Sequence, residues 1–70
     1  MAEIKSIMAG TVLSILVEKG DQIKAGEDVI ILESMKMAIP IESTIDGKVS
    51  KITVNVGDFV NDEDVLVLLE

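Results

Sequence analysis

The sequence predicts an all-β domain, folded as a small sandwich or a flattened barrel. Three observations support this class: short runs rich in β-branched residues, turn signals at regular spacing, and a repeat of the whole pattern. No stretch keeps a 3.6-residue periodicity over the length of a helix. The 70 residues show no linker or low-complexity tract, so one domain over residues 1–70 is expected.

The second half of the chain repeats the first with a shift of 37 residues. When residues 4–33 are laid over residues 41–70, about ten of the 30 positions are identical, including Gly10 with Gly47. An open solenoid needs three or more units. Two copies are instead expected to bury their apolar faces against each other, which predicts approximate two-fold symmetry.

Residues 11–17 and 48–54 are expected to be equivalent strands of the two halves, because both are rich in Val, Ile and Thr. Each strand leads to a Gly-Asp turn, at Gly20 and Gly57, where glycine accepts a positive φ. Polar loops then lead into the last apolar run of each half (loops 24–28 and 61–64; runs 29–32 and 65–69).

The connection between the halves is expected to be a hairpin. If Leu32 and Ile39 lie on paired strands, Met35 and Lys36 fall at its tip. Pro40 follows inside the fifth predicted strand and has no N–H to donate. That strand is therefore expected at a sheet edge, or Pro40 at a position that makes no ladder bond.

Composition argues against several classes of partner. Six basic and 13 acidic residues give a net charge of −7, which repels phosphate backbones, and Phe59 is the single aromatic residue. Nucleic-acid binding is therefore not expected, and the charge favours a monomer. The apolar runs are too short to span a bilayer and the first residues do not resemble a signal peptide. No membrane association and a cytoplasmic location are expected.

The residues also argue against catalysis. Histidine and cysteine are absent, which removes the usual general base, thiol nucleophile and zinc ligands. The acidic run 62–64 lacks the ligand spacing of a calcium loop, so no metal site is expected. Glu33 could act as a general base only beside a substrate pocket. A catalytic Lys36 would need burial or cationic neighbours, which a hairpin tip does not supply. A non-catalytic protein is expected.

The segment Glu33-Ser34-Met35-Lys36-Met37 places an ammonium group between two thioethers. In an extended segment, both methionines would point to one side and the lysine to the other. The segment closely resembles Glu-Ala-Met-Lys-Met, the biotin-attachment signature of biotinyl carrier domains. Matching segments in the same order extend this likeness over essentially the whole chain (residues 6–12, 17–21, 45–49 and 54–58).

The resemblance implies two four-stranded antiparallel sheets with quasi-two-fold symmetry, a barrel-sandwich hybrid, and Lys36 on an exposed hairpin. It also implies that a biotin protein ligase attaches biotin to Lys36, with Met35, Met37 and Glu33 as neighbours that the ligase recognises. The biotin arm would then carry a carboxyl group between biotin carboxylase and carboxyltransferase centres. Ser34 replaces the usual alanine, a small change that should not block modification.

Two alternatives remain open. A lipoyl carrier shares the fold and is modified by a lipoyl ligase at the same turn, and one lysine could accept both cofactors. Lipoyl domains usually have aspartate before and alanine after the lysine, whereas this chain has Met35 and Met37, which favours biotin. An unmodified adaptor or docking module would keep the repeat and make no use of Lys36.

Overall fold

Strands make up the regular structure of residues 2–70, the part of the chain that the computed structural model describes, and this part contains no helix. The eight strands are β1 (Ala2–Lys5), β2 (Gly10–Ile15), β3 (Gln22–Ile23), β4 (Asp28–Ser34), β5 (Met37–Glu42), β6 (Gly47–Ile52), β7 (Phe59–Val60) and β8 (Val65–Leu69). No helix of this part is available to cross a membrane. The predicted all-β class is confirmed.

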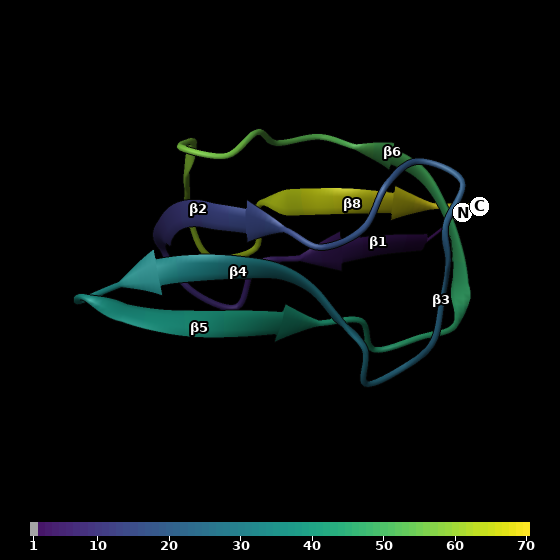
Figure 1. Ribbon diagram of the computed structural model, residues 1–70, viewed down its shortest axis with the longest axis horizontal. Coiled ribbons are helices and arrows are strands. Elements are labelled where there is room, and N and C mark those ends of the chain that lie inside the picture. The colour runs from purple at the N-terminus through teal and green to yellow at the C-terminus, as the bar shows by residue number, and fades with distance from the viewer. Residues whose placement is uncertain (1) are drawn as a thin grey trace.

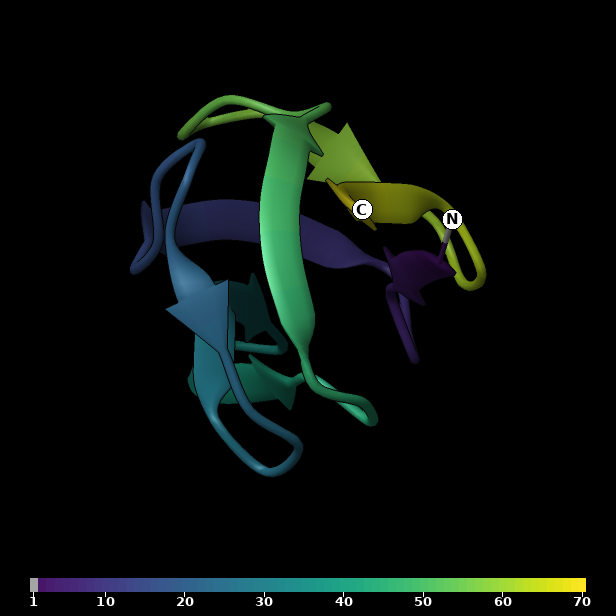
Figure 2. The same ribbon diagram turned by 90° about the vertical axis from the view of Figure 1, so that its right-hand side faces the viewer.

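The strands form two four-stranded antiparallel sheets (Figures 1 and 2). One has the order β1-β8-β6-β3 and is called here the terminal sheet, because it holds both ends of the chain. The other has the order β5-β4-β2-β7 and is called the hairpin sheet, because β4 and β5 form the hairpin that joins the two halves. β5 is an edge strand, which confirms the expectation drawn from Pro40.

The repeat predicted from the sequence relates the two sheets strand by strand. A shift of 37 residues carries β1, β2, β3 and β4 onto β5, β6, β7 and β8, and so exchanges the sheets. The register is carried over as well, since Glu3 pairs with Leu68 and Pro40 with Ile31. β2 and β6 each have a bulge at equivalent residues, Leu13 and Ser50. The two-fold relation therefore extends to the irregularities of the strands.

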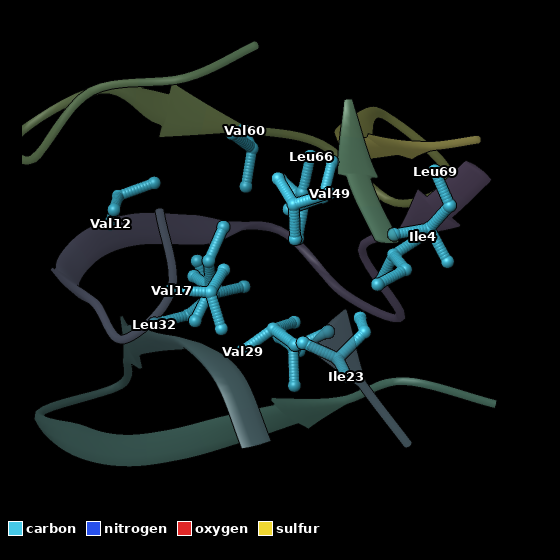
Figure 3. Close-up of a cluster of buried hydrophobic side chains, with 13 residues drawn as sticks. Ile4, Val12, Val17, Ile23, Val29, Leu32, Val49, Val60, Leu66 and Leu69 are labelled. Carbon is cyan, nitrogen blue, oxygen red and sulfur yellow. The ribbon is translucent and has the colours of Figure 1, made fainter. Parts of the chain in front are cut away.

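The core lies between the two sheets and is aliphatic (Figure 3). It is formed by Ile4, Val12, Val17, Ile23, Val29, Ile30, Leu32, Ile41, Val49, Val60, Leu66, Val67 and Leu69. The two buried polar residues, Ser6 and Ser43, are also related by the repeat, and their hydroxyls donate to the carbonyls of Met8 and Ile45. Within residues 2–70, every buried side-chain nitrogen or oxygen has a hydrogen-bond partner.

The strands that were expected over 11–17 and 48–54 are two residues shorter at their C-terminal ends, stopping at Ile15 and Ile52. After Ile15 the chain crosses from the hairpin sheet to the terminal sheet, where the Gly20 N–H donates to the Val49 carbonyl at 2.8 Å. Val17 lies in this crossing and is buried. Its β-branched character thus reflects burial in the core and not membership of a strand.

The two Gly-Asp turns are confirmed, and they have the same geometry. Gly20 and Gly57 both have a φ of 95°. The Asp21 carboxylate accepts from the Glu18 N–H at 2.9 Å, and the Asp58 carboxylate accepts from the Asn55 N–H at 2.8 Å. Each turn thus satisfies backbone donors where the chain passes from one sheet to the other.

Candidate functional site

Met35 and Lys36 form a two-residue loop between β4 and β5. The last strand pair of the hairpin is Ser34 with Met37, which leaves these two residues as the whole connection. Both have a positive φ, 52° at Met35 and 63° at Lys36. This is the backbone of a type I′ turn, whose twist matches that of the flanking strands. The tip predicted from the sequence is confirmed.

Neither residue of this loop is of a type that favours its backbone conformation. Type I′ turns strongly prefer Asn-Gly, because a Cβ in the left-handed region costs roughly 1–2 kcal/mol. Met35 and Lys36 adopt that region without a glycine or asparagine. The hairpin thus keeps an unfavourable pair of residues at its tip, as is common at functional turns.

The side chains of the tip are presented to solvent. Met35 is 93% exposed, Met37 is 63% exposed, and Lys36 is exposed. The alternation expected for an extended segment, with the lysine opposite two methionines, is wrong, because Met35 and Lys36 turn through the left-handed region. Met35 does not reach back into the core, because its side chain is exposed. The hairpin offers a partner a primary amine flanked by two accessible thioethers.

The hairpin stands at the opposite end of the long axis from the two chain ends (Figure 1). The repeat accounts for this position, since the pair Leu32 with Ile39 is equivalent to Leu69 with Ala2. Beyond the pair Leu32 with Ile39, the hairpin sheet continues with two further strand pairs, Glu33 with Ala38 and Ser34 with Met37, which lead to the loop. Lys36 therefore projects from the part of the hairpin that extends beyond the pair Leu32 with Ile39.

The base of the hairpin is held closely by β2. Gly10 approaches β4 so closely that a Cβ there would lie 2.7 Å from the carbonyl oxygen of Glu33. Next to it, Thr11 pairs with Glu33, and Leu32 is fully buried in the core. The backbone just before the loop is thus fixed by packing and pairing, while the loop itself is exposed.

Glu33 lies on the outer face of the hairpin sheet and is exposed. Its paired neighbours on that face are Thr11 and Ala38, and Phe59 pairs with Thr11 in turn. Residue patterns do not connect Thr11 or Phe59 with the hairpin, because these residues lie 25 and 23 positions from Lys36 and approach it only through strand pairing. Among residues 2–70 there is no cavity and no group of acidic side chains able to hold a metal ion.

The family model for biotin and lipoyl attachment, described as "Biotin-requiring enzyme", matches residues 2–69. The chain belongs to the biotin/lipoyl attachment family. It is 50% identical over 62 residues to the biotin/lipoyl attachment protein of Bacillus subtilis, covering 89% of this chain and 85% of that protein. It is 40% identical over 70 residues to a biotinylated protein of Mycobacterium leprae, covering 99% of each.

A solved structure gives the same picture for the fold. The crystal structure of the urea carboxylase of Kluyveromyces lactis matches with a TM-score of 0.91 and 32% identity. The match covers 99% of this chain and 6% of that much larger one. The resemblance drawn from Glu33–Met37 and the other segments is therefore confirmed. As a member of the biotin/lipoyl attachment family, the chain is a non-catalytic carrier domain.

Proposed function

We propose that this family member is biotinylated on Lys36 by a biotin protein ligase and carries a carboxyl group for a biotin-dependent carboxylase. The observation that supports this most directly is the tip of the hairpin. There an exposed lysine occupies a two-residue loop between Met35 and Met37, within a segment that resembles the attachment signature. The description of the matching family as biotin-requiring supports the choice of cofactor.

The hairpin fits a covalently attached group. Lys36 Nζ forms an amide with the carboxyl carbon of activated biotin, while the amine loses a proton and the activating group leaves. The positive charge of Lys36 disappears in this reaction. Met35 and Met37 remain accessible on either side, so a ligase can recognise both thioethers while it acylates the amine.

Once attached, biotin supplies a bicyclic ring that accepts a carboxyl group at one catalytic centre and releases it at another. The chain contributes a fixed base and an exposed tip, since β4 is approached closely by Gly10 and buries its own Leu32 in the core just before the loop. A tethered ring on such a tip has a high effective concentration at both centres. The partners proposed are therefore a biotin protein ligase and the biotin carboxylase and carboxyltransferase components of a carboxylase. The net charge of −7 supports a monomeric carrier, and a cytoplasmic location remains a prediction.

A lipoyl group on the same lysine is the second candidate. It is favoured by one specific finding, the 50% identity to a protein named for both biotin and lipoyl attachment. The hairpin geometry suits either acyl group, because both form an amide with an exposed lysine. Met35 and Met37 in place of aspartate and alanine place biotin first.

Intact-mass analysis tests this proposal. The protein is expressed with active biotin and lipoyl ligases and both cofactors supplied, alongside Lys36→Arg. We expect a biotinyl increment on the wild type and none on the variant. A lipoyl increment without a biotinyl one would reverse the order of the two candidates. Unmodified wild-type protein would overturn the carrier proposal and favour an unmodified docking module.

A further inference from the structure

The outer faces of the two sheets differ in chemistry although the repeat makes their backbones equivalent. Paired residues on neighbouring strands point to the same face of a sheet. Two rows of such pairs lie nearest the hairpin on the outer face of the hairpin sheet. They consist of Ala38, Glu33, Thr11 and Phe59 in the first row, and Pro40, Ile31 and Ser14 in the second. These residues are exposed or half-buried, which places them outside the core.

This surface is called here the apolar face, and Phe59 within it is 65% exposed. Two further exposed side chains, Leu13 and Val56, lie next to it; Leu13, at the bulge of β2, is 40% exposed. Val56 is 63% exposed in the turn before β7, and the next residue, Gly57, donates its N–H to the Val12 carbonyl at 2.8 Å. Within the two rows, Glu33 is the only charged residue.

The equivalent surface of the terminal sheet is mostly polar and charged. A shift of 37 residues replaces six residues of the apolar face by polar or charged ones, Thr11 by Lys48, Ser14 by Lys51, Pro40 by Glu3, Leu13 by Ser50, Val56 by Lys19 and Phe59 by Gln22, while Ile31 keeps an apolar equivalent in Leu68. The same backbone therefore folds with polar residues at these positions. Exposed apolar groups at them serve something other than the fold, and gathered apolar surface marks an interaction site.

The apolar face continues directly into the hairpin. Its first row contains the pair Glu33 with Ala38, and the next pair, Ser34 with Met37, closes the loop that holds Lys36. Phe59 is two strands away from Glu33 in the same row, a separation of about 10 Å at ordinary strand spacing. A protein that encloses the tip and extends over the sheet covers this face.

We propose that the apolar face is the docking surface for the ligase that modifies Lys36; this inference rests on the proposed function. An unmodified lysine reaches only about 6 Å from its Cα through five single bonds, so the enzyme that acylates it must come close to the hairpin. An attached biotin arm adds a comparable length, so a carboxylase can reach the ring from further away. Of the two partners, the ligase is therefore the one that must approach closely enough to cover the adjoining sheet.

The charge of the apolar face predicts the chemistry of the ligase surface that binds it. Glu33 lies within the apolar face, so the matching surface is apolar with a lysine or arginine opposite Glu33. A second copy of this chain fits poorly, because it would add another net charge of −7 and another Glu33 to the contact. The proposal therefore commits to a ligase with a basic and apolar surface beside its active site.

The repeat supplies substitutions that test this proposal with little risk to the fold. Phe59→Gln and Leu13→Ser introduce the residues that the equivalent positions, Gln22 and Ser50, already carry. Each variant is incubated with a purified biotin protein ligase, biotin and ATP, and the rate of biotinylation is measured against carrier concentration. We expect kcat/KM to fall about tenfold for Phe59→Gln through a higher KM, as when an aromatic anchor is removed from an interface.

Leu16→Thr is the matched control. Leu16 is 50% exposed and has Thr53 as its equivalent, but it lies beyond the end of β2 that is far from the hairpin. Its rate should equal that of the wild type. Circular dichroism checks the fold of each variant. If Phe59→Gln does not fold, Thr11→Lys, which introduces the residue found at the equivalent position 48, is measured in its place.

Each other outcome overturns the proposal in a distinguishable way. Equal rates for wild type, Phe59→Gln and Thr11→Lys would reject the docking surface and leave the modification of Lys36 intact. Normal biotinylation with slower carboxyl transfer would assign the face to a carboxylase, and a wild-type dimer that Phe59→Gln dissociates would assign it to a second copy. Wild-type protein that no ligase biotinylates would reject the proposed function and the docking surface together.

Discussion

Glu63 occupies in the second half of the chain the position that Gly26 occupies in the first, and both have a positive φ, of 69° and 90°. Both also donate equivalent hydrogen bonds. The Glu63 N–H donates to the Ser6 carbonyl and the Gly26 N–H to the Ser43 carbonyl, each at 2.8 Å. The fold therefore requires a left-handed residue at this turn in both halves, and only the first half supplies a glycine.

Glu63→Gly should therefore stabilise the protein. Removing the Cβ relieves roughly 1–2 kcal/mol of left-handed strain, and the added freedom of glycine in the unfolded chain takes back about 0.5–1 kcal/mol. The net gain of about 0.5 kcal/mol corresponds to a rise in Tm of about 2–4 °C for a domain of this size. Thermal unfolding followed by circular dichroism measures it.

Asp62→Gly is the control for this change, because it removes the same charge from the neighbouring exposed position, where φ is not positive. It should lower the Tm, since it adds only the entropic cost of glycine. A Tm that falls in both variants would contradict the strain argument.

Much of the fold could be predicted from the sequence because the repeat and the turn residues are local signals. The shift of 37 residues, the Gly-Asp turns, the edge position of Pro40 and the tip at Met35 and Lys36 all followed from residue types. The left-handed backbone at Glu63 could not be predicted, since glutamate carries no signal for it. It follows from the hydrogen bond to Ser6, which joins segments far apart in the chain.

The candidate site also has one part that the sequence predicts and another that it does not. The motif around Lys36 marks the acceptor directly, whereas the surroundings of the hairpin depend on which strands pair. Thr11 and Phe59 reach the row of Glu33 only through the order β5-β4-β2-β7. The bulge at Leu13 likewise results from pairing with β4 and has no local signature in the sequence. Long-range pairing therefore determines the part of the site that residue patterns leave undefined.

Gly10→Ala should destabilise the protein more than Gly47→Ala, although the two glycines are equivalent. A Cβ at Gly10 would lie 2.7 Å from the backbone oxygen of Glu33, which cannot move without disturbing the β2–β4 pairing. At Gly47 the nearest atom is Leu69 Cδ1, at 3.1 Å, on a side chain that can shift. We expect a loss of about 1–3 kcal/mol for Gly10→Ala and a smaller one for Gly47→Ala.

Urea unfolding of both variants measures this difference. Equal losses would mean that the backbone of β4 yields as easily as the side chain of Leu69. Because Glu33 lies in the acceptor hairpin just before its loop, folded Gly10→Ala should also be biotinylated more slowly than folded Gly47→Ala.

Met35→Asn should separate the stability of the hairpin from its recognition. Asparagine adopts the left-handed region more readily than methionine, and Met35 is 93% exposed, so no core packing is lost. The free energy of unfolding should rise by up to about 1 kcal/mol. Biotinylation should become slower, because the ligase loses one of its two thioethers.

Met35→Leu is the matched variant, since it keeps an apolar side chain and gains no preference for the left-handed region. It should leave the Tm unchanged and be biotinylated faster than Met35→Asn. If Met35→Asn is both more stable and biotinylated at the wild-type rate, the thioether at position 35 is not read by the ligase.

A circular permutant can move the acceptor hairpin from one sheet to the other. The two-fold relation carries the hairpin onto the end of the terminal sheet where Ala2 pairs with Leu69, because this pair is equivalent to Ile39 with Leu32. Joining Glu70 to Ala2 through Ser-Met-Lys-Met-Ala copies residues 34–38 onto that end. Starting the new chain at Ile39, after an initiator methionine, and ending it at Glu33 removes the original hairpin. The core and the strand pairs are retained, apart from Glu33 with Ala38 and Ser34 with Met37, so the permutant should fold.

The grafted hairpin has the same sequence and strand geometry as the original, but it adjoins Lys48, Gln22 and Glu70 in place of Thr11, Phe59 and Glu33. If the ligase docks on the apolar face, the grafted lysine should be biotinylated about tenfold or more slowly than Lys36 in the wild type, because the docking contacts are lost. If the ligase reads only the hairpin, both lysines should be modified at the same rate. Comparing kcat/KM for the two folded proteins therefore measures how much of ligase recognition lies in the sheet beside the hairpin.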